Sequence, residues 1–203
     1  MTTEIVVARY QEDISWLNKI HTFDNKIVYN KYDGNNLLDN VGREGHTYLY
    51  HIIKNYNNLA DYTLFCQGDP VFHQSSFIDD CNDIDMLYDF VADNGIYFFG
   101  MKNIESIYSI KHKTHPLGLP LYYFLDLLFD MKVNENDRFT ITYGAQFFIS
   151  KHNILNRPLK FYEFLIKFLS TEKNPIEGYI FERIWCFIFS QKIKLSPKYL
   201  VFA

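Results

Sequence analysis

A carboxylate and an amide stand together where a short apolar run of the chain ends. The run is Thr63–Cys66, and the letters QGDP follow it directly. Asp69, next to a glycine, can approach a divalent cation, and Mg2+ or Mn2+ combines few protein oxygens with substrate phosphates. Gln67 and Asp69 point to one side if the chain stays extended. His73 is a second candidate metal ligand. The alternatives are a turn capped by Asp69 and a solvated loop histidine.

Two other polar groups stand at the ends of predicted elements. Arg9 and Tyr10 end the first apolar run, where arginine can hold a phosphate and tyrosine can stack on a base. An ordinary surface strand end is the alternative. Arg43 and Glu44 lie where a helix is expected to begin. A cation there opposes the helix dipole, so Arg43 needs an anion or a carboxylate partner. A helix N-terminus can also hold a phosphate on its backbone N–H groups.

A charged pair interrupts the otherwise apolar run Phe181–Phe189. A buried charge must be paired or used, so Glu182 is a candidate general base or an acceptor for a sugar hydroxyl. A structural ion pair with Arg183 is the alternative. Gly144 and Gln146 place a small residue near an amide, which suits close approach of a ligand, or equally a β-bulge.

The elements that position these residues follow from hydrophobic periodicity. Buried strands are predicted over Glu4–Ala8, residues 26–30 and Thr63–Cys66, with a helix capped by Asn40 before the third. This strand–helix alternation predicts a largely parallel sheet, in which ligands bind at the carboxyl ends of the strands. Further predictions are antiparallel strands within Phe139–Ser150, helices over Leu159–Leu169 and Phe181–Phe189, and a rigid loop over Thr114–Pro120.

Composition limits the class of protein. The 203 residues suit a single domain, 1–203, and 48% apolar residues can build a substantial core. Aromatic residues reach 18%, which favours a site that stacks bases or sugars, although biased codon usage explains it equally well. A net charge of −4 without a basic tract argues against nucleic-acid binding.

Targeting signals and reactive motifs are not recognised in the sequence. No apolar run reaches the roughly 18 residues of a transmembrane segment, and the first residues do not resemble a signal peptide. The odd, widely spaced cysteines Cys66, Cys81 and Cys186 predict a reducing, cytoplasmic setting. No P-loop, dinucleotide fingerprint or catalytic triad is readable.

Four blocks of the sequence resemble a domain-of-unknown-function family, which is itself similar to a chlorella-virus glycosyltransferase domain of the GT-A fold. The blocks are VVARYQEDISWL, NVGREGHTYLYHIIKNYNNLADYTLFCQGDP, YGAQFFISKHNILNRPLKFYEFL and YIFERIWCFIF. The NVGREGHTYLYHI block is the specific one. The region Phe77–Asp137 is not part of this resemblance.

The resemblance implies an α/β, GT-A-like fold with a central mixed, mostly parallel sheet flanked by helices. It also implies a nucleotide-sugar donor, with a UDP-sugar expected, whose diphosphate is bridged by Mn2+ or Mg2+, and a glycan acceptor. Residues Ala8 to Tyr10 would meet the nucleotide, and Gln67 to Asp69 would replace the Asp-x-Asp metal motif. The neutral Gln67 departs from that motif, which weakens metal affinity.

The remaining site residues follow in the same way: Gly144 to Gln146 would face the donor sugar or the acceptor, and Glu182 would lie near the acceptor. The expected function is therefore sugar transfer from a nucleotide sugar to a glycan. Two alternatives remain open at this point. One is a non-catalytic nucleotide- or carbohydrate-binding module on the same fold, which Gln67 favours. The other is a structural partner protein.

Overall fold

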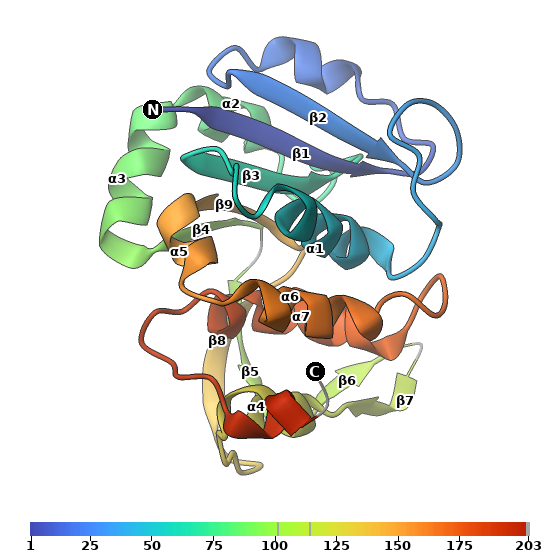
Figure 1. The fold of residues 1–203 in the computed structure, drawn as a ribbon, viewed down its shortest axis with the longest axis vertical. Helices are drawn as coiled ribbons and strands as arrows, with labels where there is room; N and C mark the ends of the chain where they lie inside the picture. Colours follow the sequence, from blue (N-terminus) through green and yellow to red (C-terminus); the bar gives the residue numbers. More distant parts are fainter. Residues whose placement is uncertain (101, 114, 202–203) are drawn as a thin grey trace.

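A five-stranded sheet forms the centre of the molecule in a computed structural model that describes residues 1–100, 102–113 and 115–201 (Figure 1). The strand order is β2-β1-β3-β9-β4. β1, β2 and β3 are parallel, β9 is antiparallel to both of its neighbours, and β4 therefore runs parallel to β3. The strands are β1 (Thr3–Arg9), β2 (Asn25–Asn30), β3 (Tyr62–Gln67), β4 (Ile96–Phe99) and β9 (Gln146–Ser150). The predicted mixed, mostly parallel sheet flanked by helices is confirmed.

Both faces of the sheet are buried, which explains why β1 is continuously apolar rather than alternating. Val6 and Ala8 belong to one hydrophobic core, whereas Ile5 and Val7 belong to the other. Successive side chains of a strand point to opposite faces, so a strand covered on both sides needs apolar residues at every position. The run EIVVA therefore fixes a central strand of a three-layer α/β structure.

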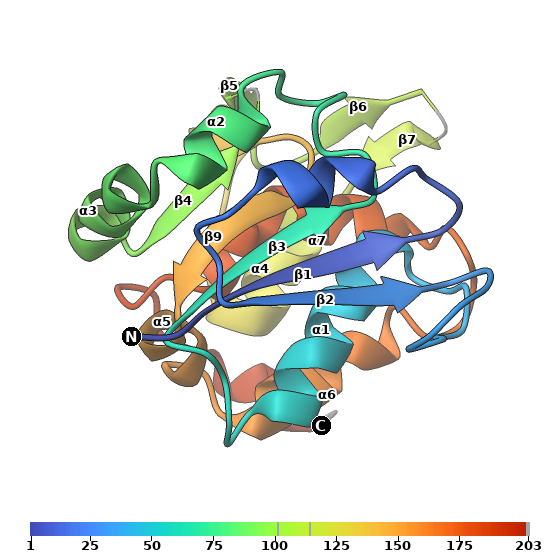
Figure 2. The ribbon, with the colours of Figure 1, turned by 90° about the horizontal axis from the view of Figure 1, so that it is seen from above.

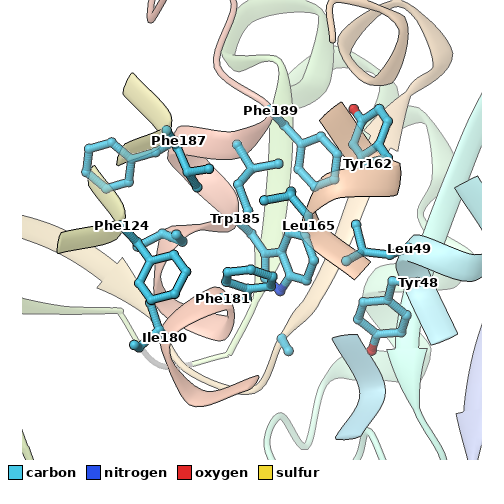
Figure 3. Packing of buried hydrophobic residues seen from close by; sticks show 14 of the residues in the cluster. Tyr48, Leu49, Phe124, Tyr162, Leu165, Ile180, Phe181, Trp185, Phe187 and Phe189 are labelled. Atoms are coloured by element: carbon cyan, nitrogen blue, oxygen red, sulfur yellow. The ribbon is translucent and has the colours of Figure 1, made fainter. Parts of the chain in front are cut away.

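The larger core packs helices against one face of the sheet (Figure 1). Its centre is the aromatic stretch of α7, where Trp185 lies 6.0 Å from Phe181 and 5.6 Å from Phe189, measured between ring centroids (Figure 3). Burying each such side chain contributes roughly 1.5–3 kcal/mol. The longer helices of this core are α1 (Arg43–Asn55), α4 (Leu121–Phe129), α6 (Leu159–Lys167) and α7 (Ile176–Ile188).

The smaller core lies on the other face of the sheet, and Figure 2 shows the ribbon from above, with α2 and α3 beside the sheet. The 3-10 helix η1 (Ser15–Lys19), α2 (Phe77–Asn82) and α3 (Ile84–Asn94) supply it. The short helices α5 (Lys151–Leu155) and η2 (Pro197–Val201) complete the helical elements of the described chain. No helix in the described ranges is long and apolar enough to cross a membrane.

Two small antiparallel pairs extend below α7 (Figure 1). β5 (Lys102–Ser106) pairs with β8 (Arg138–Thr142), and β6 (Ile110–His112) pairs with β7 (His115–Leu119). The rigid loop predicted over Thr114–Pro120 is thus wrong for residues 115–119, which form a strand, while Thr114 lies outside the described residues. A two-stranded pair consists of edge strands, where a proline is tolerated.

Helix α1 begins later, and by another device, than the sequence predicts. Its N-cap is Gly42 in the left-handed region, at φ +61°, and not Asn40. A Cβ atom at residue 42 would lie 2.3 Å from the backbone oxygen of Leu169 and 2.6 Å from its Cβ. Both the backbone angle and the close packing therefore require glycine here.

Gly42→Ala should lower the free energy of unfolding by about 3 kcal/mol or more, because the clash with the Leu169 backbone adds to the left-handed strain. Gly34→Ala is the matched control. Gly34 has φ +97°, but the nearest atom to a Cβ there is a side-chain nitrogen of Asn30 at 3.3 Å. The control should cost only about 1–2 kcal/mol. Urea denaturation measures both, and equal losses would contradict the close packing at Gly42.

Candidate functional site

The site lies at the edge of the sheet where the parallel strands end. In the sheet, β1 lies between β2 and β3. The chain therefore continues from β1 to β2 on one side and then crosses over to β3 on the other side. Ligands of open α/β sheets bind at such a switch point, outside the carboxyl ends of the strands. Arg9 pairs with Asn30, and Ala8 pairs with Gln67, so the three strand ends are level.

A cavity of about 200 Å³ lies at this edge. The end of β1, the residue after β2, the end of β3 and the start of α1 all contribute to it. The loop between α6 and α7 closes it. The lining residues are Ala8, Arg9, Tyr10, Glu12, Lys31, Asn40, Arg43, Glu44, Gln67, Lys173 and Asn174. Six residues that the sequence assigns to donor binding, Ala8, Arg9, Tyr10, Arg43, Glu44 and Gln67, therefore lie together around one cavity.

Arg43 adopts a backbone conformation that is unusual for a side-chain-bearing residue, with φ +54° directly after the left-handed Gly42. The N–H groups of Gly42 and Arg43 donate to the carbonyls of Glu172 and Lys173, at 2.8 and 3.2 Å. These bonds hold the start of α1 against the loop that closes the cavity. Strained backbone of this kind concentrates at functional sites.

The guanidinium of Arg43 is held but not fully used. Its carbon lies 4.1 Å from the ring centroid of Tyr179, and Nε lies 3.5 Å from the Glu44 carboxylate. Its Nη1 is buried and has no hydrogen-bond partner among the described residues. A buried donor without a partner is costly, so a ligand oxygen that accepted from this nitrogen would lower that cost.

Lys31 follows β2 and lies almost fully buried against the same corner. Its ammonium group donates to the carbonyls of Val41 and Arg43, on both sides of the left-handed Gly42. Burial lowers the pKa of Lys31 to about 8, while the charge of Glu44 acts in the opposite direction. The lysine thus ties the loop before α1 to the end of β2.

Two carboxylates share the cavity with these cations. Glu12 Oε2 accepts hydrogen bonds from the backbone N–H groups of Tyr10 and Gln11, at 2.6 and 3.1 Å. A Cβ at Gly68 would meet that oxygen at 2.5 Å, so Glu12 lies directly against the end of β3. Burial raises the pKa of Glu44, and the nearby Arg43 only partly opposes this.

The other predicted residues gather around Gly144, next to the cavity. Because β9 is antiparallel, its first residue Gln146 lies at the edge where β3 and β4 end. Gln67 Nε2 donates to the Gly144 carbonyl at 3.4 Å, so Gln67 joins the two groups. A Cβ built on Gly144 would lie 3.5 Å from the Cβ of His73. Gln146 donates to the carbonyl of Pro70 at 3.4 Å, and its Oε1 is buried without a partner among the described residues.

Glu182 reaches this second group from α7. Its Oε1 accepts a hydrogen bond from the Gly144 N–H at 2.8 Å, and its Oε2 lies 3.0 Å from Arg183 Nη1. Arg183 also donates to the Tyr179 carbonyl. The structural ion pair considered for Glu182 is present. Burial alone would lower the pKa of Arg43, but the charges of Glu44 and Glu182 raise it above its ordinary value. A role in catalysis stays a prediction.

Asp69 is placed differently from the other candidates. Its side chain is exposed, and Oδ1 accepts a hydrogen bond from the Phe72 N–H at 3.3 Å, which caps the turn after β3. It does not line the cavity. Across residues 1–100, 102–113 and 115–201, no group of three or more His, Cys, Asp or Glu side chains could hold a metal ion.

Sequence reasoning missed several residues of the cavity: Glu12, Lys31, Asn40 (assigned there only as a cap), Lys173 and Asn174. Lys31 directly follows β2, and Glu12 comes three residues after the end of β1, so the strand-end rule that found Arg9 could have found them. Lys173 lies in a loop whose sequence, STEKNP, reads as solvated. Only tertiary packing brings it to the sheet edge.

Comparison with known proteins gives the family. A model of the family described as "Protein of unknown function (DUF3431)" matches residues 5–94 and 109–201, and the chain belongs to this family. Between residues 5 and 201 the match leaves out only 95–108, so most of Phe77–Asp137, which the sequence resemblance excluded, is part of the family. No curated protein and no solved structure matches the chain significantly.

Lys31→Met should change how stability depends on pH. In the wild type, the folded pKa of Lys31 is about 8 and the unfolded value is near 10.5. Between these values the unfolded chain binds more protons, so the free energy of unfolding should rise with pH from about 8 to 10.5. The methionine variant should lack this rise. Urea denaturation at several pH values gives the free energy of unfolding of both proteins. If the two plots of this free energy against pH ran parallel, the lowered pKa of Lys31 would be contradicted.

Proposed function

We propose that the chain is a glycosyltransferase that moves a sugar from a nucleotide-sugar donor, with a UDP-sugar as the expected donor, to a glycan or protein-linked glycan. One observation carries the proposal. Residues expected to meet the donor, from three separate segments, line a single cavity at the switch point of the sheet. The resemblance to a GT-A-type viral domain supports the same reading, and the mixed sheet is compatible with it.

The cations of the cavity suit the donor diphosphate. Negative charge develops on the departing nucleoside diphosphate, and fixed positive groups aimed at it lower the barrier. Arg9 and Arg43 supply planar donors for phosphate oxygens. Tyr10 lies at the cavity, with its ring 5.4 Å from that of Tyr32, and is our candidate for contact with the base.

The acceptor is proposed to approach from the Gly144 group. Glu182 would accept a proton from the attacking hydroxyl or orient it, as an inverting transfer requires. To do so, its carboxylate would exchange the N–H of Gly144 or the guanidinium of Arg183 for the hydroxyl. His73 and Gln146 flank the same glycine and are candidates for sugar contacts.

The residues of the cavity do not fit the metal ion of the expected mechanism. The resemblance implies Mn2+ or Mg2+ held by an acidic pair, but the cavity contains the neutral Gln67, while Asp69 and His73 do not line it. Charged oxygens are the ligands that such an ion prefers. The two carboxylates of the cavity are engaged with other groups: Glu12 Oε2 accepts two backbone N–H groups, and Glu44 lies beside Arg43.

The second candidate function is a non-catalytic nucleotide- or carbohydrate-binding module. Gln67 in the cavity and the engagement of both Glu182 oxygens favour it. A reducing, cytoplasmic setting is part of either proposal, and the three cysteines, all free, are compatible with it.

Titration of UDP-sugars into the protein tests donor binding. We expect saturable binding to at least one UDP-sugar, with and without Mn2+. Asp69→Ala should bind the donor as the wild type does when Mn2+ is absent, because Asp69 does not line the cavity. If Mn2+ tightens binding only in the wild type, Asp69 is a metal ligand after all. Failure to bind any nucleotide sugar would remove the glycosyltransferase proposal.

Release of UDP from the donor without acceptor separates enzyme from binding module. A transferase should hydrolyse its donor slowly, whereas a module should not. Glu182→Gln keeps an acceptor for the Gly144 N–H but cannot take a proton, so transfer should fall about 10²–10⁴-fold with little change in donor affinity. Glu163→Gln, on the exposed side of α6, is the matched control. If Glu182→Gln transferred sugar at the wild-type rate, the carboxylate of Glu182 would have only a structural role.

A further inference from the structure

The cavity at the sheet edge carries a charge opposite to that of the whole chain. The chain has a net charge of −4, yet the cavity is lined by four cations and two carboxylates. The cations come from four separate segments: Arg9 from β1, Lys31 after β2, Arg43 at the start of α1, and Lys173 before α7. Convergence of one sign of charge in a cleft concentrates ligands of the other sign.

The cations keep donors that the protein does not use. Arg9 donates through Nε to the Glu12 carbonyl at 2.9 Å, and through Nη1 to Asn30 Oδ1 at 2.8 Å and to the exposed Asp33 carboxylate at 3.3 Å. Its other terminal nitrogen has no bond to the described residues. Nη1 of Arg43 is buried without a described partner. Lys173 is exposed, with its ammonium 4.8 Å from the centroid of the Tyr10 ring.

The two carboxylates of the cavity do not cancel these cations. The bonded oxygen of Glu12 is held by two backbone N–H groups at the end of β1. Glu44 Oε2 lies 3.5 Å from the Nε of Arg43, and the Nη1 nitrogen of the same guanidinium has no partner among the described residues. A buried, unpaired guanidinium nitrogen costs free energy, and an anionic ligand that bonds to it removes that cost.

The size of the cavity restricts the anion. A volume of about 200 Å³ is below the roughly 300–1,000 Å³ of pockets that enclose a drug-sized ligand. It suits the diphosphate rather than a whole nucleotide sugar. The nucleoside and the sugar would then extend from the cavity, towards Tyr10 on one side and Gly144 on the other.

We infer that this cavity binds a diphosphate group directly through Arg9, Arg43 and Lys173, without a bridging divalent metal ion. The inference rests on the proposed function for the identity of the ligand, and it replaces the metal that the resemblance implies with side chains of the chain itself. Lys31 is a positioning residue in this site, since its ammonium holds the two carbonyls on either side of the left-handed corner before Arg43.

Inorganic pyrophosphate is the probe. Isothermal titration of the full chain with pyrophosphate in excess EDTA should show saturable one-site binding, tighter than binding of inorganic phosphate. Addition of Mg2+ or Mn2+ should not tighten it. No binding in EDTA, or binding that appears only with the metal, would overturn the inference.

Variants locate the bound anion. Lys173→Gln removes an exposed cation and should weaken pyrophosphate binding about three- to tenfold, and Arg9→Gln should weaken it about tenfold. Arg43→Gln should abolish measurable binding, with circular dichroism used to verify folding. Arg138→Gln is the matched control, because Arg138 is exposed on β8, away from the cavity. Equal losses in Arg138→Gln and Lys173→Gln, or no loss in Lys173→Gln and Arg9→Gln, would contradict the site.

The same titrations separate this inference from the proposed function. Pyrophosphate binding in EDTA without binding of any UDP-sugar would keep the diphosphate site and reject nucleotide-sugar transfer. Binding of a UDP-sugar only in the presence of Mn2+, with no pyrophosphate binding in EDTA, would keep the transferase proposal and reject the metal-free site.

Discussion

The left-handed corner at Gly42 and Arg43 is the constraint on which the site depends. Two consecutive residues at positive φ turn the chain sharply into α1, and the second of them carries a long side chain. Such a residue costs on the order of 1–3 kcal/mol and persists only where its surroundings enforce it. Here the enforcement comes from Leu169 against the glycine, from the carbonyls of Glu172 and Lys173, and from the ammonium of Lys31.

The same corner brings separate parts of the structure together. α1 packs on the sheet through its apolar face, and α7 lies against it with Tyr179 under the guanidinium of Arg43. Glu182, one turn further along α7, bonds the Gly144 N–H before β9. The corner therefore links the guanidinium of Arg43, the loop between α6 and α7, and, through α7, the turn before β9.

Local patterns predicted most of the central sheet because its strands are determined by local composition. A strand buried on both faces needs apolar residues at every position, and EIVVA and TLFC have them. The predictions failed where local signals were ambiguous. The segment after residue 114 contains two prolines and a glycine and reads as a loop, yet residues 115–119 pair with β6. Asn40 is a good cap by type, but the N-cap is Gly42, a position where only glycine fits against Leu169.

Residue types and spacing alone place polar side chains after the strands and put Arg43 and Glu44 in the first turn of a helix. Parallel strands share an edge, so these residues had to approach one another. Which of them meet depends on the packing of the whole fold. Lys173 comes to the cavity through long-range packing, whereas Asp69, two residues beyond Gln67, turns onto its own loop. The reason is physical: residue type and spacing fix local conformation, but the direction of a side chain beyond a strand end depends on what packs against the loop that carries it.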